Sequence, residues 1–318
     1  MNPLTVNDFY QRNKDACQLA LLGEGAGLDR LIQGNGLARP GLALAGFWEK
    51  FEDQAIQVCG PAEAAYLRKL SPAELEHLLS KFAALPLACL IVSDGQKVPE
   101  ITVAAAQKAR LPVLLSKLPA HLLMVKLAGY LDTYFAERML VHGSFVDVHG
   151  VGLLLTGKSG IGKSEIALEL MERGHRLVGD DIITVYRKSE GILIGTGSEL
   201  LKHYIELRGI GIVDIRGIFG LRAVRQEKRL EMEVRLERWN RQKHFERLGL
   251  DTVETSYLGV PIPLVTLPIF PGKNITIILE VVALNYILYQ TYGYRPAEKL
   301  NERLIKLMAE KAQKRAMV

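Results

Sequence analysis

The feature that most constrains this chain is a glycine-rich segment, TGKSGIGKSE, at Thr156–Glu165. Gly157, Gly162, Lys163 and Ser164 occupy every fixed position of the pattern GxxxxGK[ST]. An apolar run precedes the segment and a helical pattern follows it, which is the strand–loop–helix context of a phosphate-binding loop. The alternative is a glycine-rich turn before an unrelated helix, and such a turn would not need a strand directly before it. The segment therefore predicts an α/β nucleotide-binding fold.

Each fixed letter of the pattern has a physical reason. Glycines let backbone N–H groups wrap around a phosphate at the positive end of the helix. Lys163 is expected against the β- and γ-phosphates, and the Ser164 hydroxyl on Mg²⁺. ATP and Mg²⁺ are therefore the expected ligands. The predicted nucleotide-binding residues are Gly157, Lys158, Ser159, Gly160, Ile161, Gly162, Lys163 and Ser164.

Acidic residues follow this loop at two places. Asp180 and Asp181 end the segment RLVGDD, where a short strand can deliver a metal ligand or a base to a bound phosphate. A charged turn between two strands is the other interpretation of this pair. Glu206 and Arg208 lie in the glycine-punctuated segment YIELRGIGIVD. Glu206 is either a second Mg²⁺ ligand or a simple ion-pair partner of Arg208, and the spacing does not decide. His142, in VHGSFVDVHG, is by itself more typical of a structural histidine.

Composition excludes several classes of protein. Among 318 residues, 48% are hydrophobic and 24% charged, which is ordinary globular composition. The net charge of +5 fits an anionic partner but equally a mildly basic soluble protein. Cys17, Cys59 and Cys89 form no CxxC pair, which predicts no disulfide or thiolate zinc site and favours a cytoplasmic location. We expect no membrane span, because no apolar run approaches roughly 18 residues.

The first part of the chain alternates strand and helix patterns. Apolar runs at Ile56–Cys59, Leu87–Val92 and Pro112–Leu115 predict strands, and helical patterns lie between and after them. This rhythm predicts a small N-terminal α/β domain over residues 1–135, with a partly parallel sheet.

The second part, residues 136–318, is expected to be a P-loop catalytic domain with a β-rich, mixed sheet. Its predicted helices are Lys163–Glu172, which Gly174 ends, and a final amphipathic helix that begins at Pro296. Ile275–Glu280 is expected to be a strand. The stretch Arg222–Arg247 carries nine Lys or Arg residues and five Glu. Helical pairs on a solvated face would explain it, as would a basic clamp on phosphate or on an acidic protein.

Taken together, these residues resemble one family, HPr kinase/phosphorylase. The resemblance runs from PGLALAGF at Pro40–Phe47 through the phosphate-binding loop, GHRLVGDD and YIELRGIGIVDI to FERLGLD and PGKN. It implies an ATP-dependent kinase that phosphorylates a serine of the carrier protein HPr in the regulation of bacterial carbon metabolism. It also implies the reverse activity, in which inorganic phosphate attacks phosphoseryl-HPr and releases pyrophosphate. Family members are similar in being homohexamers with a fold like phosphoenolpyruvate carboxykinase, and no nucleic acid or membrane is expected as a partner.

The resemblance also implies roles for individual residues. Ser164 and Glu206 would be the Mg²⁺ ligands, and Asp181 would take the seryl proton and return it in phosphorolysis. His142, Lys163 and Arg247 would complete the catalytic set. Ile205–Asp214 matches the signature segment for both activities, and Pro268–Lys273 matches the segment tied to dephosphorylation.

The sequence departs from the family at three positions. Lys158 stands where an acid is common, and Phe270 and Lys273 stand where arginines are usual. Phe270 removes a cation near the expected phosphate site, so phosphorolysis is the activity that this change affects.

Two other functions fit parts of the pattern. A small-molecule or carboxykinase-like P-loop kinase would label a metabolite instead of a protein. A regulatory module would use ATP to order a loop and Arg222–Arg247 to bind nucleic acid, and would show salt-sensitive binding without transfer.

Overall fold

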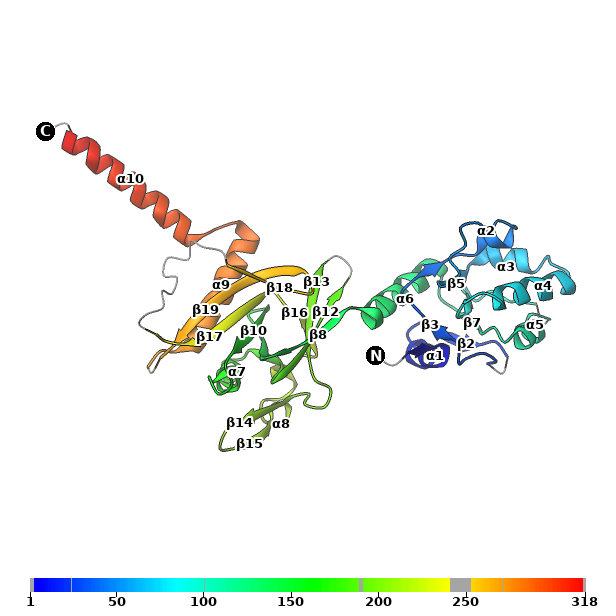
Figure 1. The fold of residues 1–318 in the computed structure, drawn as a ribbon, viewed down its shortest axis with the longest axis horizontal. Helices are drawn as coiled ribbons and strands as arrows, with labels where there is room; N and C mark the ends of the chain where they lie inside the picture. The colour runs from blue at the N-terminus through cyan, green and yellow to red at the C-terminus, as the bar shows by residue number, and fades with distance from the viewer. Residues whose placement is uncertain are drawn as a thin grey trace. The chain divides into compact units, whose positions relative to one another are not determined.

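The chain divides into two units, Met1–Phe135 and Ala136–Val318 (Figure 1). The computed structural model describes residues 3–23, 25–99, 101–188, 191–240, 253–270 and 272–316, of which 310–316 are described by their helical backbone alone. Each unit is described below by itself.

The N-terminal unit is built around a mainly parallel sheet with strand order β2-β7-β6-β5-β4. Neighbours from β4 to β7 are parallel, and β2 is antiparallel to β7. The strands of the unit are β1 (Leu4–Thr5), β2 (Leu19–Leu21), β3 (Leu31–Ile32), β4 (Leu37–Ala38), β5 (Ile56–Cys59), β6 (Leu90–Val92) and β7 (Val113–Ser116). The helices are α1 (Val6–Asn13), α2 (Gly41–Leu44), α3 (Pro61–Leu67), α4 (Pro72–Ala83), α5 (Ile101–Ala109) and α6 (Ala120–Phe135).

Local sequence explains these elements. All four residues of β5 are buried, as expected for a parallel strand covered on both faces. Helix α4 begins where Ser71 and Glu74 cap each other and Pro72 takes the first helical position. The predicted α/β rhythm and partly parallel sheet of this unit are therefore confirmed.

The C-terminal unit contains the phosphate-binding loop between β10 and α7. Its strands are β8 (Arg138–His142), β9 (Ser144–Val148), β10 (Val151–Gly157), β11 (Arg176–Gly179), β12 (Ile182–Lys188), β13 (Ile192–Gly197), β14 (Tyr204–Leu207), β15 (Gly211–Asp214), β16 (Glu227–Arg229), β17 (Met232–Arg238), β18 (Glu254–Tyr257) and β19 (Val260–Ile269). Its helices are α7 (Lys163–Glu172), α8 (Ile215–Phe219), the short 3₁₀ helix η1 (Leu221–Ala223), α9 (Ile275–Tyr292) and α10 (Pro296–Ala316).

The central sheet of this unit is mixed, with strand order β11-β9-β10-β17-β19-β18. β10 is antiparallel to β9 and parallel to β17, and β17 is parallel to β19. A second, antiparallel sheet runs in the order β16-β13-β12-β8, and β14 pairs with β15 in a separate hairpin. The predicted mixed, β-rich sheet is confirmed.

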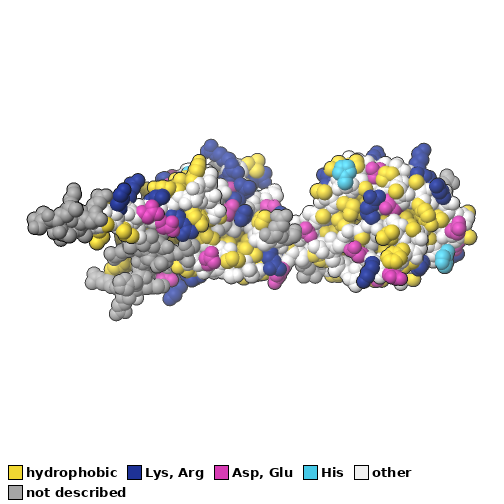
Figure 2. Space-filling view, turned by 90° about the horizontal axis from the view of Figure 1, so that it is seen from above, with side chains coloured by type: hydrophobic (Ala, Val, Ile, Leu, Met, Phe, Trp, Pro, Cys, Tyr) yellow, Lys and Arg dark blue, Asp and Glu magenta, His cyan; other side chains and the backbone are white. Residues whose placement is uncertain are grey.

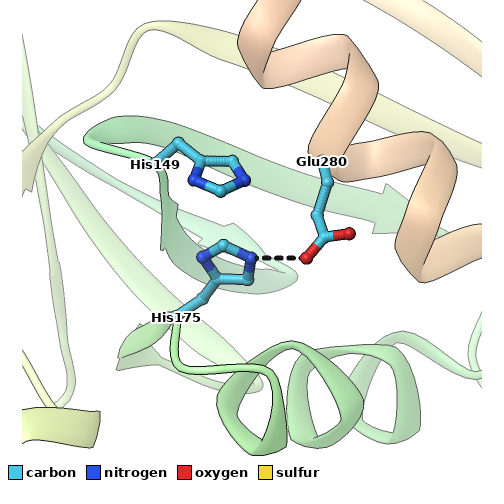
Figure 3. A group of neighbouring side chains, drawn as sticks. All are labelled: His149, His175 and Glu280. Atoms are coloured by element: carbon cyan, nitrogen blue, oxygen red, sulfur yellow. Dashed lines mark hydrogen bonds and ion pairs between the residues drawn. The ribbon is translucent and has the colours of Figure 1, made fainter.

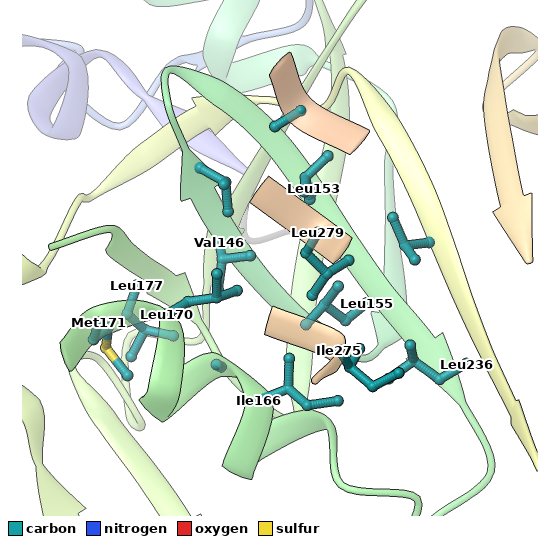
Figure 4. Packing of buried hydrophobic residues seen from close by; sticks show 14 of the residues in the cluster. Val146, Leu153, Leu155, Ile166, Leu170, Met171, Leu177, Leu236, Ile275 and Leu279 are labelled. Carbon is teal, nitrogen blue, oxygen red and sulfur yellow. The ribbon is translucent and has the colours of Figure 1, made fainter. Parts of the chain in front are cut away.

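The core explains why β10 is buried on both faces. Leu153 and Leu155 pack with Ile166 and Leu170 of α7 and with Leu279 of α9 (Figure 4). Leu154, between them, points to the opposite face of the sheet, where it packs in a second cluster with Phe145 and residues of β12 and β13. The strand that carries the phosphate-binding loop is thus held between helices on one face and the second sheet on the other.

One sequence expectation is wrong in this unit, and one of the two interpretations of Arg222–Arg247 is excluded. Ile275–Glu280 is not a strand but the start of α9, whose N-cap Asn274 accepts a hydrogen bond from the Ile277 N–H at 3.0 Å. The described part of Arg222–Arg247 contains no α-helix, because it forms the end of the short 3₁₀ helix η1 and then β16 and β17. Its basic residues therefore lie on two strands and in the segments before them, and they do not line one face of an α-helix.

Helix α9 also corrects the expectation that no apolar run reaches the length of a membrane span. Its 18 residues have a mean hydropathy of 1.3, so the helix is long and apolar enough to cross a membrane by length and composition alone. One face of α9 nevertheless packs on the core through Ile275, Leu279 and Ala283. Its Glu280 side chain pairs with Arg173 at 2.6 Å. These contacts tie one face of α9 to the core of the C-terminal unit, although only 22% of the helix is buried.

The three cysteines, Cys17, Cys59 and Cys89, are free and buried, so the expected absence of a disulfide among them is confirmed. Burial raises the pKa of Cys59 and of Cys89 to about 12. These thiols are therefore packing groups and not nucleophiles.

Candidate active site at the phosphate-binding loop

The phosphate-binding loop opens into a polar pocket of the C-terminal unit. The pocket is lined by His142, Ser159, Gly160, Gly162, Lys163, Ser164, Glu165, Asp180, Asp181, Glu206 and Arg208. These residues come from β8, the loop itself, the start of α7, the β11–β12 turn and the β14–β15 hairpin. Elements far apart in sequence therefore converge on one polar cavity.

The loop's conformation depends on two glycines. Gly157 has φ 141°, and a Cβ there would lie 2.5 Å from the Leu236 carbonyl oxygen on β17. Gly160 has φ 72°, and a Cβ there would lie 2.7 Å from a guanidinium nitrogen of Arg208. Neither position accepts a side chain without a shift of the neighbouring atoms, so the backbone can approach both the sheet and a phosphate closely.

Lys163 and Ser164 begin α7, whose N-terminal N–H groups and dipole favour a bound anion. Lys163 is buried, and its Nζ donates to the Gly157 carbonyl oxygen at 3.3 Å. The Ser164 hydroxyl donates to an Asp180 carboxylate oxygen at 2.8 Å. The loop lysine and serine are thus already oriented along the pocket wall.

Asp180 is a buried acid, only 5% exposed. Burial raises the pKa of its carboxyl group, although hydrogen bonds from the Ser144 and Ser164 hydroxyls oppose that rise. In the described part of the chain, no basic side chain forms an ion pair with it. A buried carboxylate beside a serine hydroxyl is a donor set that suits a hard divalent cation such as Mg²⁺.

Asp181 differs from its neighbour because its carboxylate is half-exposed. It lies 3.0 Å from His142 Nδ1, and the two side chains are 53% and 54% exposed respectively. Its backbone has φ 66°, a left-handed conformation that is uncommon outside glycine. The turn is held by hydrogen bonds from Gly143 N–H to the Asp181 carbonyl and from Ile182 N–H to the Asp180 carbonyl. The strained turn places one acid inside the wall and the other at the pocket mouth.

The β14–β15 hairpin supplies Glu206 and Arg208 to the pocket. These two residues form no ion pair with each other in the part of the chain that the structure describes, which removes the simple pairing interpretation of Glu206. Arg208 instead lies against the phosphate-binding loop at Gly160. Both charges therefore face the space next to the loop.

The structure brings together most of the predicted site residues. His142, Lys163, Ser164, Asp181 and Glu206 line one pocket. Arg247 and Pro271 lie outside the described residues. Phe270 is 42% exposed, and the Lys273 ammonium lies 5.2 Å from its ring centroid.

Two pocket residues, Asp180 and Arg208, make contacts that residue spacing does not predict. The sequence makes Asp180 a candidate metal ligand or base, but it does not predict the hydrogen bond with Ser164, because side-chain direction at a left-handed turn does not follow strand alternation. Pairing with Arg208 is one of two interpretations of Glu206 from sequence, whereas in the structure Arg208 lies against Gly160.

A loop that presents backbone amides, a lysine and a serine beside paired acids defines a class of protein, the P-loop phosphotransferases. Comparison with known sequences makes the assignment specific. The family model described as HPr Serine kinase C-terminal domain matches residues 133–304, and that described as HPr Serine kinase N terminus matches residues 4–143. The chain belongs to the HPr kinase/phosphorylase family.

Individual relatives are similar over nearly the whole chain. The HPr kinase/phosphorylase of Prosthecochloris aestuarii is 41% identical over 315 residues, which cover 98% of this chain and 93% of that protein. That of Chlorobaculum tepidum is 45% identical over 269 residues, covering 84% of this chain and 79% of that protein. A solved structure of the Hpr(Ser) kinase/phosphatase from Coxiella burnetii is 31% identical, with a TM-score of 0.43, and covers 48% of this chain and 98% of that one.

Proposed function

We propose that this chain transfers the γ-phosphoryl group of ATP to a serine hydroxyl of HPr, and that it also catalyses the phosphorolysis of phosphoseryl-HPr. In the second reaction, inorganic phosphate attacks the seryl phosphate, the serine regains its proton, and pyrophosphate leaves. The family assignment supports both directions. The physiological role would be control of bacterial carbon metabolism through HPr.

The observation that carries this proposal is the position of Asp181. Its half-exposed carboxylate shares one pocket with Lys163 and Ser164 of the phosphate-binding loop. A seryl hydroxyl entering the pocket mouth can give its proton to this carboxylate while the loop holds the donor phosphates. His142, 3.0 Å away, fixes the orientation of the carboxylate. By microscopic reversibility, the same acid returns the proton in phosphorolysis.

Mg²⁺ fits the oxygen donors of this pocket. Ser164, Asp180 and Glu206 are the residues that would hold it, and Asp180 extends the predicted pair of ligands. When bound, the cation would neutralise charge on the donor phosphates. Lys163 and Arg208 add positive charge on the loop side, so the transferring phosphate would be surrounded by cationic groups.

The hairpin that carries Glu206 also favours a protein acceptor over a small metabolite. Within the hairpin and the two short helices that follow it, Ile210, Ile212, Ile218 and Leu221 are 76%, 71%, 65% and 71% exposed. Exposed apolar side chains clustered beside a polar site are typical of a protein-docking surface. We infer that HPr docks on this surface with its serine directed at Asp181.

The nucleic-acid alternative has less support. The basic residues of Arg222–Arg238 are distributed over η1, β16 and β17. Several are paired with acids, as Arg225 is with Asp147 and Arg235 with Glu233. On the face of the N-terminal unit in view in Figure 2, basic side chains are separated by acidic and apolar ones.

The proposal also includes a fold like phosphoenolpyruvate carboxykinase, a cytoplasmic location and a homohexameric assembly. A phosphoenolpyruvate carboxykinase-like arrangement agrees with a P-loop strand that has one parallel and one antiparallel neighbour. A cytoplasmic location agrees with three reduced cysteines. The uncovered apolar residues of α10, Leu300, Leu304, Leu307 and Met308, support self-association into the expected homohexamer.

The role of Asp181 is tested by Asp181→Asn. The amide keeps the shape but cannot take a proton, so we expect the rate of HPr phosphorylation to fall by about 10²–10⁴-fold while ATP binding is retained. Quantitative mass spectrometry of HPr gives the rate, and a fluorescent nucleotide gives the binding.

The matched control is Glu172→Gln, which removes an exposed carboxylate at the other end of α7 and should leave the rate unchanged. Full activity of Asp181→Asn would show that another group handles the proton.

A further inference from the structure

Away from the nucleotide pocket, two histidines and a glutamate gather at the C-terminal end of α7. His149 lies in the turn between β9 and β10, His175 follows α7, and Glu280 projects from α9 (Figure 3). Their ligand atoms all lie within 4.8 Å of one another. Because α7 has 10 residues and rises about 1.5 Å per residue, this cluster lies about 15 Å from the phosphate-binding loop.

The backbone turns direct the two imidazoles toward each other. His149 and Gly150 are both left-handed, with φ 51° and 88°, in the two-residue turn of the β9–β10 hairpin. The His149 ring meets the His175 ring edge-on, with 4.6 Å between centroids. His149 is exposed, whereas His175 is only 7% exposed.

Glu280 is held in place as a carboxylate. Arg173 donates to it twice, from Nε at 2.8 Å and from Nη2 at 2.6 Å, and His175 Nε2 lies 3.0 Å from Oε1. The two bonds from Arg173 fix the position and orientation of the carboxylate. After these bonds Oε2 keeps a second lone pair, and Oε1 keeps one only when His175 Nε2 carries no proton. A hydrogen bond from a basic residue to a ligating carboxylate is a common outer-shell arrangement in metal sites.

We propose that His149, His175 and Glu280 form a binding site for a transition-metal cation of the Zn²⁺ type, separate from the nucleotide site. Two imidazoles and one carboxylate are a ligand set that Zn²⁺ takes, with water in the fourth position. Mg²⁺ prefers oxygen ligands and would not compete well here.

The geometry needs only a small adjustment. Ligand atoms about 2.1 Å from a tetrahedral zinc lie about 3.4 Å apart, close to the 3.0 Å between His175 Nε2 and Glu280 Oε1. Rotation of the exposed His149 ring brings the third nitrogen into range. The neutral His175 tautomer with its proton on Nδ1 leaves the Nε2 lone pair free for the metal. The carbonyl end of α7 adds a favourable negative potential for the cation.

Metal binding would join three elements of the C-terminal unit, the β9–β10 hairpin, the end of α7 and the start of α9. A cation that binds only the folded chain stabilises it by mass action. At a metal concentration 100 times Kd, the midpoint of thermal unfolding should rise by about 5–10 °C.

The test is a titration of the metal-free full-length protein with Co²⁺, which reports coordination by its visible absorption, followed by displacement with Zn²⁺. Millimolar Mg²⁺ is kept present to occupy the oxygen ligands of the nucleotide pocket, and ATP is left out because its phosphates would bind Co²⁺. His149→Asn removes one ligand but retains the turn, because asparagine tolerates the left-handed conformation. His142→Asn removes a histidine of the nucleotide pocket and serves as the control.

We expect one Co²⁺ per chain, a binding constant at least about 10-fold weaker in His149→Asn, and an unchanged absorption band in His142→Asn. Absence of a Co²⁺ band, or equal binding by His149→Asn, would show that the cluster is an ion-pair network only. Loss of the band in His142→Asn instead would place the metal in the nucleotide pocket and overturn the proposal. Because no activity is measured, these outcomes are independent of the HPr kinase assay.

Discussion

Asp180 and Asp181 are adjacent in sequence, yet their carboxylates have different surroundings. Asp180 is 5% exposed, and its carboxylate accepts hydrogen bonds from two serine hydroxyls. The Asp181 side chain is 53% exposed and contacts His142. The left-handed φ of 66° at Asp181 produces this division. One acid is suited to hold a cation and the other to exchange a proton with an acceptor.

The environment of Asp180 predicts a conflict between stability and function. Burial raises the carboxyl pKa in the folded state above its unfolded value near 3.8. The stability linked to this proton is therefore complete below pH 3.8 and is lost as the pH rises through the folded-state pKa. At pH 7, the free energy of unfolding of Asp180→Asn should exceed that of wild type by about 0.5–2 kcal/mol, so the variant is more stable. Its rate of phosphoryl transfer should fall sharply.

Urea unfolding at pH 7 and at pH 4 measures this effect, and the difference between variant and wild type should narrow at the lower pH. A variant that is less stable than wild type at pH 7 would show that Asp180 is a structural acid instead of a cation ligand.

Residue patterns located the pocket better than they assigned its members. The fixed glycines, Lys163 and Ser164 identify a phosphate-binding loop because few other folds need those residues at those spacings. The direction of Arg208 depends on how the β14–β15 hairpin is placed, which is a tertiary property. Residue spacing alone cannot contain that information.

At the scale of elements, α7 and α9 hold the loop-bearing strand in place. Both helices pack on the same face of β10 (Figure 4). Glu280 of α9 also forms an ion pair with Arg173 at the end of α7. The α9 sequence begins ITIILE, whose β-branched residues favour a strand locally. The Asn274 cap and the left-handed Gly293 at the other end mark a helix, and packing of its apolar face overrides the local preference.

The packing of α9 predicts a clear stability effect. Leu279 is fully buried between α9 and β10. Leu279→Ala should therefore lower the free energy of unfolding by about 2–5 kcal/mol, because it leaves a cavity that the sheet cannot fill. Chemical denaturation followed by circular dichroism measures the change.

Leu221→Ala, at a position that is 71% exposed, is the control and should alter stability by less than about 0.5 kcal/mol. Equal effects of the two substitutions would mean that α9 does not pack on the sheet as described.

At the scale of the whole molecule, apolar surface remains uncovered in the single chain. Leu304, Ile305 and Met308 of α10 are 49%, 59% and 70% exposed, and Val281 and Leu284 of α9 are about half-exposed. The final amphipathic helix was predictable from its periodicity, but its partner was not, because the apolar face packs on nothing within the described chain.

A homohexamer predicts a particle mass six times the 35.3 kDa of the chain. Light scattering coupled to size exclusion measures that mass directly, and Leu304→Glu with Met308→Glu should reduce it by placing charges in the contact. A mass equal to one chain at micromolar concentration would contradict the assembly.

In the function proposed above, one pocket transfers a phosphoryl group to HPr and returns it to inorganic phosphate. The most direct measurement labels HPr with ATP that carries radioactive γ-phosphate, removes the nucleotide, and then adds unlabelled phosphate with Mg²⁺. The account predicts label on a serine of HPr and its release as pyrophosphate, with both steps lost in Asp181→Asn. Label that appears in a metabolite, or that leaves HPr as inorganic phosphate, would contradict it.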